Sequence, residues 1–356
     1  MSDQQFAERV PGSTAPYRVA QWATGNVGAR SLRAVIEHPQ LDLVGVLVHD
    51  PAKAGRDAGE LCGTGPVGVT TTSDIGDIIR LKPDCVLYMP QGCDFDAVCR
   101  LLAAGVNIVT TRGEFLNPAH IDAAMRARVE AACHAGGASI HSTGSSPGFI
   151  TEAVPLVLAS IQRRLDCLII DEFADVSSRD SPQMIFQIMG FGAPPSDFDE
   201  RRIEYIKHSF APSLHLVAEA VGLPLDEVVA SGDMACARET THIAAGTLEA
   251  GTVAATRIEV TGLRRGRALL RFRANWYCTA DIDKDWNLRA TGWRVQVEGD
   301  TPLDVEIRFP IPLERMAAVT PGYTAHRAVN AIAYVCAAAP GIRTSTDLPQ
   351  IIPFLG

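Results

Sequence analysis

Several kinds of protein are excluded by what this sequence lacks. No stretch of its 356 residues reaches the about 18 apolar residues that a membrane-spanning helix needs, so we expect no membrane association. Lysine and arginine form no run and the net charge is −9, which argues against nucleic acid or an acidic membrane surface as a partner.

Cysteine usage also excludes some architectures. The nine cysteines are scattered, odd in number and without C-x-x-C spacing. This usage is typical of reduced thiols in the cytoplasm, and it argues against a disulfide framework or a zinc site. Residues 1–16 are polar and lack the apolar core of a signal peptide, so we predict a flexible leader there.

The chain has enough length and apolar content for two domains. Apolar residues make up 47% of the sequence, and short apolar runs alternate with helical patterns through the first half. This alternation predicts a doubly wound parallel sheet of the Rossmann type, α/β in class. The expected strands cover 17–23, 41–50, 67–70, 85–89, 106–110 and 138–144. A helix is expected to begin after Asn117 and Pro118, which suit the N-cap and the first helical position.

The second half has a different pattern. A long strand is expected at 166–177, then a broken helical stretch to about residue 230. Four segments between 255 and 310 predict an open, largely antiparallel sheet, so this domain is α+β. The alternation "RFRANW" at 271–276 predicts that one face of this sheet is wet. The tail, 322–342, is predicted to be an amphipathic helix.

These patterns divide the chain into four parts. They are a leader at 1–16, a dinucleotide-binding domain at 17–150, a substrate-binding α+β domain at 151–315, and a C-terminal helix at 316–356 that returns to the first domain.

The loop "ATGNVG" joins the first expected strand to the first helix. Ala23 takes the place of the first glycine of the dinucleotide fingerprint, and Gly25 and Gly28 hold the other two. Gly25 would let backbone amides approach a pyrophosphate, and Gly28 would let the helix lie close to the strand. We therefore predict that residues 23–28 bind a dinucleotide, with contacts from Thr24, Gly25, Asn26, Val27 and Gly28.

The end of the second strand bears on the choice between NAD and NADP. An acid at this position usually binds the ribose hydroxyls, whereas a basic residue admits a 2′-phosphate. The chain offers His49 and Asp50, followed by Lys53 and Arg56, and "DPAK" is also compatible with an ordinary solvated turn. These residues are therefore compatible with either NAD or NADP.

Three further loops follow strands whose carboxyl ends should meet at the ligand-binding edge of the sheet. They are "MPQG" (89–92), "TTRGEF" (110–115) and "STGSSPGF" (142–149), and Glu114 is their only carboxylate. None supplies a metal-ligand cluster, so no metal is expected, and His134 and His141 are expected to be core or surface residues. The predicted cofactor contacts from these loops are Pro90, Gln91, Thr110, Thr111, Gly144 and Pro147.

These features resemble a known family. The first domain is similar to the N-terminal domain of dihydrodipicolinate reductases. The whole chain is more similar to 2,4-diaminopentanoate dehydrogenases and the related native NAD(P)-dependent amine dehydrogenases. The resemblance rests on "QWATGNVG" (21–28), "RGEF" (112–115), "SSPGF" (145–149) and "AVNAI" (328–332).

The resemblance implies roles that the residues alone do not. It implies that Glu114 is the catalytic residue, that the protein is a homodimer, and that the second domain forms much of the dimer contact. It also implies that the tail helix lies beside the nicotinamide, so Asn330 either meets the cofactor or faces solvent.

Departures from related enzymes narrow the substrate. Dihydrodipicolinate reductases carry paired histidines and a lysine where this chain has "EFADVSSRDSPQ" (172–183), so that activity is not expected. No lysine occurs in the three loops, and "SPQMIFQIMGFG" (181–192) is apolar, which predicts a substrate with an uncharged far end. The candidate pocket residues, each otherwise an ordinary core residue, are Phe149, Phe173, Met184 and Phe186.

The resulting hypothesis is a cytoplasmic amine dehydrogenase that uses NAD or NADP. It would convert a small primary amine reversibly to a ketone or aldehyde and ammonia, with Glu114 as acid/base and Phe115 keeping its carboxylate dry. The alternatives are another carbonyl oxidoreductase on the same fold and a non-catalytic protein that senses NAD(P).

Overall fold

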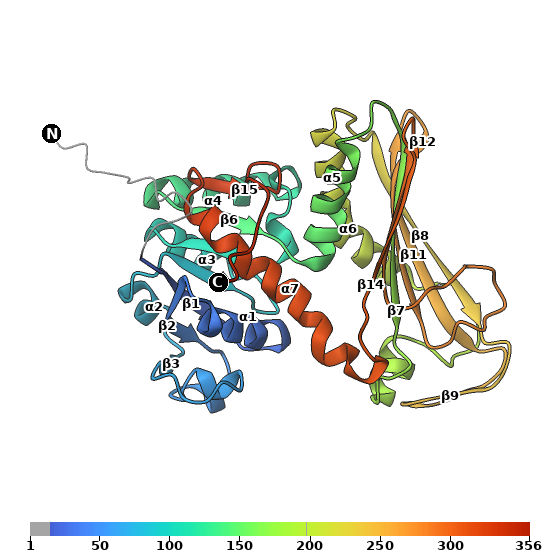
Figure 1. Ribbon diagram of the computed structural model, residues 1–356, viewed down its shortest axis with the longest axis horizontal. Helices are drawn as coiled ribbons and strands as arrows, with labels where there is room; N and C mark the ends of the chain where they lie inside the picture. The colour runs from blue at the N-terminus through green and yellow to red at the C-terminus, as the bar shows by residue number, and fades with distance from the viewer. Residues whose placement is uncertain (1–14, 197) are drawn as a thin grey trace. The chain divides into compact units, whose positions relative to one another are not determined.

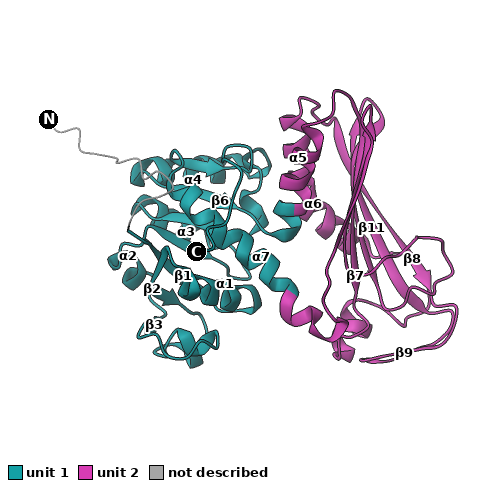
Figure 2. Cartoon of the chain, viewed as in Figure 1, with its two compact units in different colours: residues 1–149, 320–356 teal, residues 150–319 magenta. Residues whose placement is uncertain are grey.

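The chain forms two compact units. The computed structural model describes residues 15–196 and 198–356, so all but the last two residues of the leader expected at 1–16 lie outside it. The first unit combines Met1–Phe149 with Thr320–Gly356, and the second is Ile150–Val319 (Figure 2).

The first unit is built on a seven-stranded parallel sheet. Its order, β15-β6-β5-β4-β1-β2-β3, reverses between β1 and β4, as in a Rossmann sheet. The expected α/β class is confirmed. The strands are β1 (Tyr17–Trp22), β2 (Leu41–Leu47), β3 (Thr71–Thr72), β4 (Cys85–Tyr88), β5 (Asn107–Thr110), β6 (Ser139–Ser142) and β15 (Gly341–Arg343).

Helices cover both faces of this sheet (Figure 1). Val35 of α1 and Ile332 of α7 pack in one buried cluster with Val19 and Leu87 of the strands. The other face carries α2, α3 and α4, which pack in a second cluster. Because both faces are covered, the central strands β1 and β4 are mostly apolar and buried. The helices are α1 (Asn26–Glu37), α2 (Ile75–Arg80), α3 (Phe95–Ala103), α4 (Ala123–Gly136) and α7 (Leu313–Cys336), and the short turns are η1 (Pro51–Lys53), η2 (Gly59–Leu61), η3 (Gly113–Phe115) and η4 (Pro118–His120).

The second unit contains a six-stranded sheet of order β14-β13-β7-β12-β11-β8. Only β7 and β12 pair in parallel, so the expected, largely antiparallel sheet is confirmed. Its strands are β7 (Leu165–Asp175), β8 (Glu227–Cys236), β11 (Val253–Arg264), β12 (Arg267–Tyr277), β13 (Gly292–Gly299) and β14 (Leu303–Arg308), and a separate pair is formed by β9 (Thr241–Ile243) and β10 (Gly246–Leu248). The helical segments are η5 (Ser145–Ala153, which begins in the first unit), α5 (Val154–Ala159), η6 (Gln183–Ile188) and α6 (Glu200–Ala220).

The two faces of the second sheet differ in polarity. Helix α6 packs on one face, where Phe210 stacks on Phe272 with ring centroids 3.7 Å apart. The opposite face is polar and partly exposed, as predicted: the Arg271 side chain is 38% exposed, and Ser231 and Asp233 of β8 are exposed. Some polar side chains of this face are nevertheless buried against one another. Asn275 is fully buried, and the Asp171 carboxylate accepts a hydrogen bond from Arg273 Nη2 at 2.8 Å.

Two predictions for the first unit were wrong near turns. Residues 67–70 are not a strand, because the Asp57 carboxylate accepts hydrogen bonds from the backbone N–H groups of Val67 and Gly68 and holds a turn. Asn117 caps only the short turn η4, and Asp122 caps α4 by accepting from two backbone N–H groups.

Two further predictions failed in longer segments. The tail helix begins at Leu313 and ends at Cys336, and Gly341–Arg343 add a seventh strand beside β6 instead of extending the helix. Strand β8 lies where the end of the helical stretch was expected, because its pairing with β11 stabilises an extended conformation.

Candidate cofactor and active site

The glycine loop brings the start of α1 close to the end of β1. Ala23 adopts a φ of +70°, the left-handed conformation that glycine prefers and that a fingerprint glycine would adopt freely. A Cβ added at Gly28 would lie 2.3 Å from the Ala23 carbonyl oxygen, so only glycine allows this close approach of helix and strand. Gly25 has no atom near such a Cβ and caps α1 without a side-chain hydrogen bond, which leaves the first turn open to an anion.

The segment after β2 brings one of its two basic residues to this loop. Lys53 Nζ donates to the backbone oxygen of Thr24 at 3.2 Å and lies 3.3 Å from Thr24 Oγ1. The Asp50 carboxylate accepts from the Ala52 N–H and so caps the turn η1. His49 Nε2 accepts a hydrogen bond from Trp22 Nε1 at 3.0 Å. Lys53 is therefore the basic residue in contact with the glycine loop, whereas Arg56 pairs with Glu60 on the surface.

Glu114 lies directly after β5 and is paired with a neighbouring arginine. Arg112 Nη2 donates to Glu114 Oε1 at 2.6 Å, and Arg112 Nε donates to Glu114 Oε2 at 3.2 Å. Arg112 Nη1 also donates to the backbone oxygen of Gln91, in the loop after β4. The Thr110 hydroxyl donates to the Tyr88 oxygen at 2.6 Å and accepts from the Arg112 N–H. Arg112 thus binds the carboxylate of its own loop and links it to the loop after β4.

Phe115 does not shield this carboxylate as the sequence suggested. It is fully buried in the sheet core, 5.6 Å from Phe95 between ring centroids, because the turn η3 directs it inward. The Glu114 side chain is 27% exposed. The negative charge of Glu114 affects the neighbouring Cys93 thiol. Burial, the larger cause, and the Glu114 charge together raise the pKa of Cys93 to about 12.

The loop after β6 and the part of α7 from Thr320 onward belong to the first unit. The Ser145 hydroxyl lies 2.7 Å from the Thr324 hydroxyl of α7, and the Arg327 guanidinium lies 5.9 Å from the centre of the Phe149 ring. Gly148 has a φ of +117° and passes close to Thr143. Asn330 is half-buried on α7, and its side-chain amide forms no hydrogen bond with the residues that the structure describes.

His141 is a core residue. It is fully buried on β6, and its Nδ1–H donates to the backbone oxygen of Arg343 at 2.7 Å. Burial lowers the pKa of His141 to about 4, so the imidazole is neutral at pH 7. His134, by contrast, is exposed on α4.

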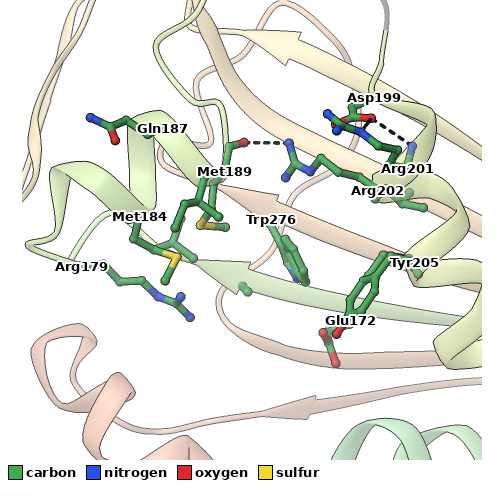
Figure 3. A pocket seen from close by; sticks show the side chains of 15 residues that line it. Glu172, Arg179, Met184, Gln187, Met189, Asp199, Arg201, Arg202, Tyr205 and Trp276 are labelled. Carbon is green, nitrogen blue, oxygen red and sulfur yellow. Dashed lines mark hydrogen bonds and ion pairs between the residues drawn. The ribbon is translucent and has the colours of Figure 1, made fainter. Parts of the chain in front are cut away.

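The second unit contains a cavity of about 830 Å³ (Figure 3). It lies on the helix-covered side of the sheet. Of the four predicted pocket residues, Met184 lines it. Phe173 and Phe186 pack instead in the core around β9 and β10, and Phe149 belongs to the first unit. The residues that line the cavity are Glu172, Ala174, Val176, Arg179, Met184, Gln187, Ile188, Met189, Asp199, Arg201, Arg202, Tyr205, Ile206, Ile258 and Trp276.

The charges in this cavity were not foreseen. The apolar stretch 181–192 supplies part of the wall, as expected from its composition. Glu172 comes from β7, however, and Arg202 from α6, so the prediction of an uncharged far end for the substrate does not follow from this cavity. The alternation of side chains along the strand could have predicted this, because Glu172 and Phe173 must point to opposite faces of the sheet.

Residues 15–196 and 198–356 contain neither a membrane span nor a metal-ligand cluster. No helix among them combines the length and hydropathy of a membrane span. No group of three or more His, Cys, Asp or Glu side chains among them is arranged to hold a metal ion. All nine cysteines are thiols and not disulfides.

Comparison with known proteins shows similarity to dehydrogenases. The chain is 29% identical over 349 residues to an amine dehydrogenase of Streptomyces virginiae, covering 92% of this chain and 95% of the relative. The solved structure of an amine dehydrogenase from Mycobacterium smegmatis matches with a TM-score of 0.70 and 20% identity, covering 95% and 98% of the two chains. A 4-hydroxy-tetrahydrodipicolinate reductase of Synechococcus elongatus is 30% identical over 102 residues, 27% of this chain and 37% of the relative.

The fold, the glycine loop and these relatives make the protein an NAD(P)-dependent oxidoreductase. Among such enzymes, the profile of the 2,4-diaminopentanoate dehydrogenase C-terminal domain matches residues 152–356, more than half of the chain. The protein belongs to this family, and the resemblance seen in the sequence is confirmed.

Proposed function

We propose that the protein is an amine dehydrogenase that interconverts a small primary amine and a ketone or aldehyde with release or uptake of ammonia. The observation that carries the proposal is the carboxylate of Glu114. It follows the carboxyl end of β5, and only β4 lies between β5 and the point where the sheet order reverses. Ligands of open α/β sheets bind outside these strand ends. Membership of the family and similarity to two amine dehydrogenases support the same reaction.

The residues of the first unit fit NAD(P). Gly25 leaves space at the start of α1, Gly28 allows the close approach of helix and strand, and Lys53 supplies a cation beside Thr24. When bound, the cofactor would accept or donate the hydride of the reaction. The backbone amides of residues 25–28 would hold its pyrophosphate, with Thr24, Asn26, His49 and Asp50 as further contacts. Further proposed contacts are Pro90, Gln91, Thr110, Thr111, Gly144, Pro147 and Asn330.

Glu114 would move the protons of the reaction. Oxidation of an amine requires removal of a proton from the substrate ammonium, and hydrolysis of the iminium requires further proton transfers to and from water. One carboxylate can perform these transfers through Oε1 or Oε2, and its negative charge stabilises the iminium cation. Arg112 would hold the carboxylate in one orientation between reaction cycles, because two N–H groups of its guanidinium bind both oxygens.

Two further properties complete the proposal. The family resemblance suggests a homodimer with the second unit at the contact. Nine cysteine thiols without a disulfide suit a reducing compartment, which supports the cytoplasm as the place of action.

The test is single-turnover hydride transfer in Glu114→Gln and Glu114→Ala. We expect ketone-driven oxidation of NAD(P)H by the wild-type protein only when ammonium is present. We expect both variants to bind cofactor normally and to lose at least a hundredfold in rate, the range of an essential acid/base. A loss of less than tenfold contradicts the role of Glu114. Turnover of ketones without ammonium identifies a carbonyl oxidoreductase, and cofactor binding without any turnover identifies an NAD(P) sensor.

A further inference from the structure

The cavity of the second unit contains a carboxylate that no cation neutralises. Glu172 lies on β7, opposite Ala274 of β12 and Trp293 of β13. Its Oε2 accepts a hydrogen bond from Trp293 Nε1 at 3.1 Å, which fixes the side chain. Within the described part of the chain, Glu172 forms no ion pair, and its Oε1 accepts no hydrogen bond. A half-buried carboxylate is stabilised when each oxygen accepts a hydrogen bond, and a ligand with a donor group can supply the bond that Oε1 lacks.

The other charged side chains of the cavity are paired with each other, hydrogen-bonded to the backbone or exposed. Asp199 is neutralised by Arg201, which donates to its two oxygens at 3.1 and 3.0 Å. Arg202 Nη1 donates to the backbone oxygen of Met189 at 2.9 Å, and burial lowers the pKa of Arg202. Arg179 is exposed. The half-buried Glu172 is therefore the charge best placed to bind a ligand within the cavity.

The wall beside Glu172 suits a cation with an apolar body. Trp276 lies opposite Ala174, two residues along β7 from Glu172, so the indole and the carboxylate are diagonal neighbours on one face of the sheet. Figure 3 shows the Trp276 and Tyr205 rings and the Glu172 carboxylate lining the same cavity. An aromatic face attracts an ammonium group, and its area buries an apolar body.

Part of the exposed cavity lining is also apolar. Met184, Ile188 and Tyr205 line the cavity and are 38%, 59% and 71% exposed, which is high for large apolar side chains. Exposed apolar clusters of this kind mark ligand or partner surfaces. At about 830 Å³, the cavity lies within the range of small-molecule sites.

From these contacts we propose that the cavity binds an organic cation, a primary ammonium group on an apolar body, and that Glu172 is the residue that selects for the charge. The ammonium would donate to Oε1 of Glu172 and lie near the Trp276 ring. A neutral alcohol of the same shape loses the ion pair, and a carboxylate is repelled. The inference does not rest on the proposed function, because Glu172 and Glu114 belong to different units.

Binding to the full-length protein tests the proposal without turnover. Isothermal titration calorimetry with 2-phenylethylammonium, its neutral isostere 2-phenylethanol and the anion phenylacetate compares the three charges. We expect the cation to bind the wild-type protein most tightly, with an affinity that falls as salt is added. Glu172→Gln keeps an oxygen that accepts from Trp293 and removes only the charge. It should weaken binding of the cation at least tenfold and change binding of the alcohol less than twofold.

A matched control removes a carboxylate elsewhere in the same unit. Glu204 is exposed on α6 and pairs with Lys207 at 3.6 Å, so Glu204→Gln should leave all three affinities within twofold. The proposal is overturned if Glu172→Gln binds the cation as the wild type does, if Glu204→Gln weakens it equally, or if phenylacetate binds more tightly than the cation. If Glu172→Gln does not fold, the absence of a salt effect on the wild-type affinity for the cation overturns it.

Failure of this proposal is distinguishable from failure of the proposed function. Glu114→Gln should lose hydride transfer and still bind 2-phenylethylammonium, because Glu114 belongs to the other unit. Cation binding through Glu172 in a protein that oxidises no amine would refute the proposed function alone. Amine oxidation together with unchanged binding in Glu172→Gln would refute the cation site alone.

Discussion

Arg112 holds Glu114 through two hydrogen bonds, at 2.6 and 3.2 Å, and binds the backbone oxygen of Gln91 with its remaining terminal nitrogen. One guanidinium thereby links the ends of β4 and β5. Because the pair is about 30% exposed, its contribution to the free energy of unfolding is small, roughly 1 kcal/mol or less. Its importance would lie in the orientation of the carboxylate.

We therefore predict that Arg112→Met folds normally and loses about 10- to 100-fold in kcat/KM for amine oxidation, the range expected when a catalytic group is misplaced by about 1 Å. Arg112→Lys should recover only part of the rate, because an ammonium cannot bind both oxygens in the same plane. Added guanidinium should partly rescue Arg112→Ala. The control is Arg33→Met, which breaks a surface pair with Glu37 and should leave steady-state rates unchanged.

Lys53 is predicted to decide how well NADP binds. Its Nζ lies 3.2 Å from the Thr24 oxygen, beside the proposed dinucleotide loop. A hydrogen bond to a charged group contributes about 1.5–3 kcal/mol, so Lys53→Met should weaken NADPH binding about 10- to 100-fold and NADH binding less than threefold. Fluorescence titration measures both. Arg56→Met, which breaks only the pair with Glu60, is the control. An equal loss for both cofactors would show that Lys53 does not contact a 2′-phosphate.

Ala23 is predicted to be a strained position. Its φ of +70° costs an L-residue roughly 1 kcal/mol, which glycine avoids, although glycine also gains freedom in the unfolded chain. Ala23→Gly should therefore raise the free energy of unfolding by about 0.5 kcal/mol in urea denaturation. Ala29→Gly, inside α1, should lower it by about 1 kcal/mol. If both variants lose stability equally, the loop does not hold Ala23 in the left-handed conformation.

His141 is predicted to make the protein less stable in acid. Its pKa is about 4 in the folded protein and about 6.5 when unfolded, so between these values only the unfolded chain binds the proton. Stability should therefore fall as the pH drops from 7 to 4, with His141 contributing about 3 kcal/mol. His141→Asn keeps a donor for the Arg343 oxygen and removes the titration. Its free energy of unfolding should depend less on pH than that of the wild type, and identical slopes would contradict the assignment.

Much of the first unit could be predicted because its signals are local. Buried parallel strands read as short apolar runs, and glycines mark the turn at residues 23–28. Local signals failed where a distant partner decided the conformation. Hydrogen bonds to Asp57 keep residues 67–70 in a turn instead of a strand, and pairing with β6 makes Gly341–Arg343 a strand.

The candidate site divides in the same way. The sequence by itself determined that Glu114 follows a buried strand and is the only carboxylate in the three loops after β4, β5 and β6, since these facts depend on neighbouring residues alone. Only the tertiary structure decided that Arg112, not Phe115, contacts that carboxylate, and that Glu172 rather than Phe173 lines the cavity. Side-chain direction depends on the turn geometry and on the face of the sheet that packs against a helix, and both are set by contacts between residues distant in sequence.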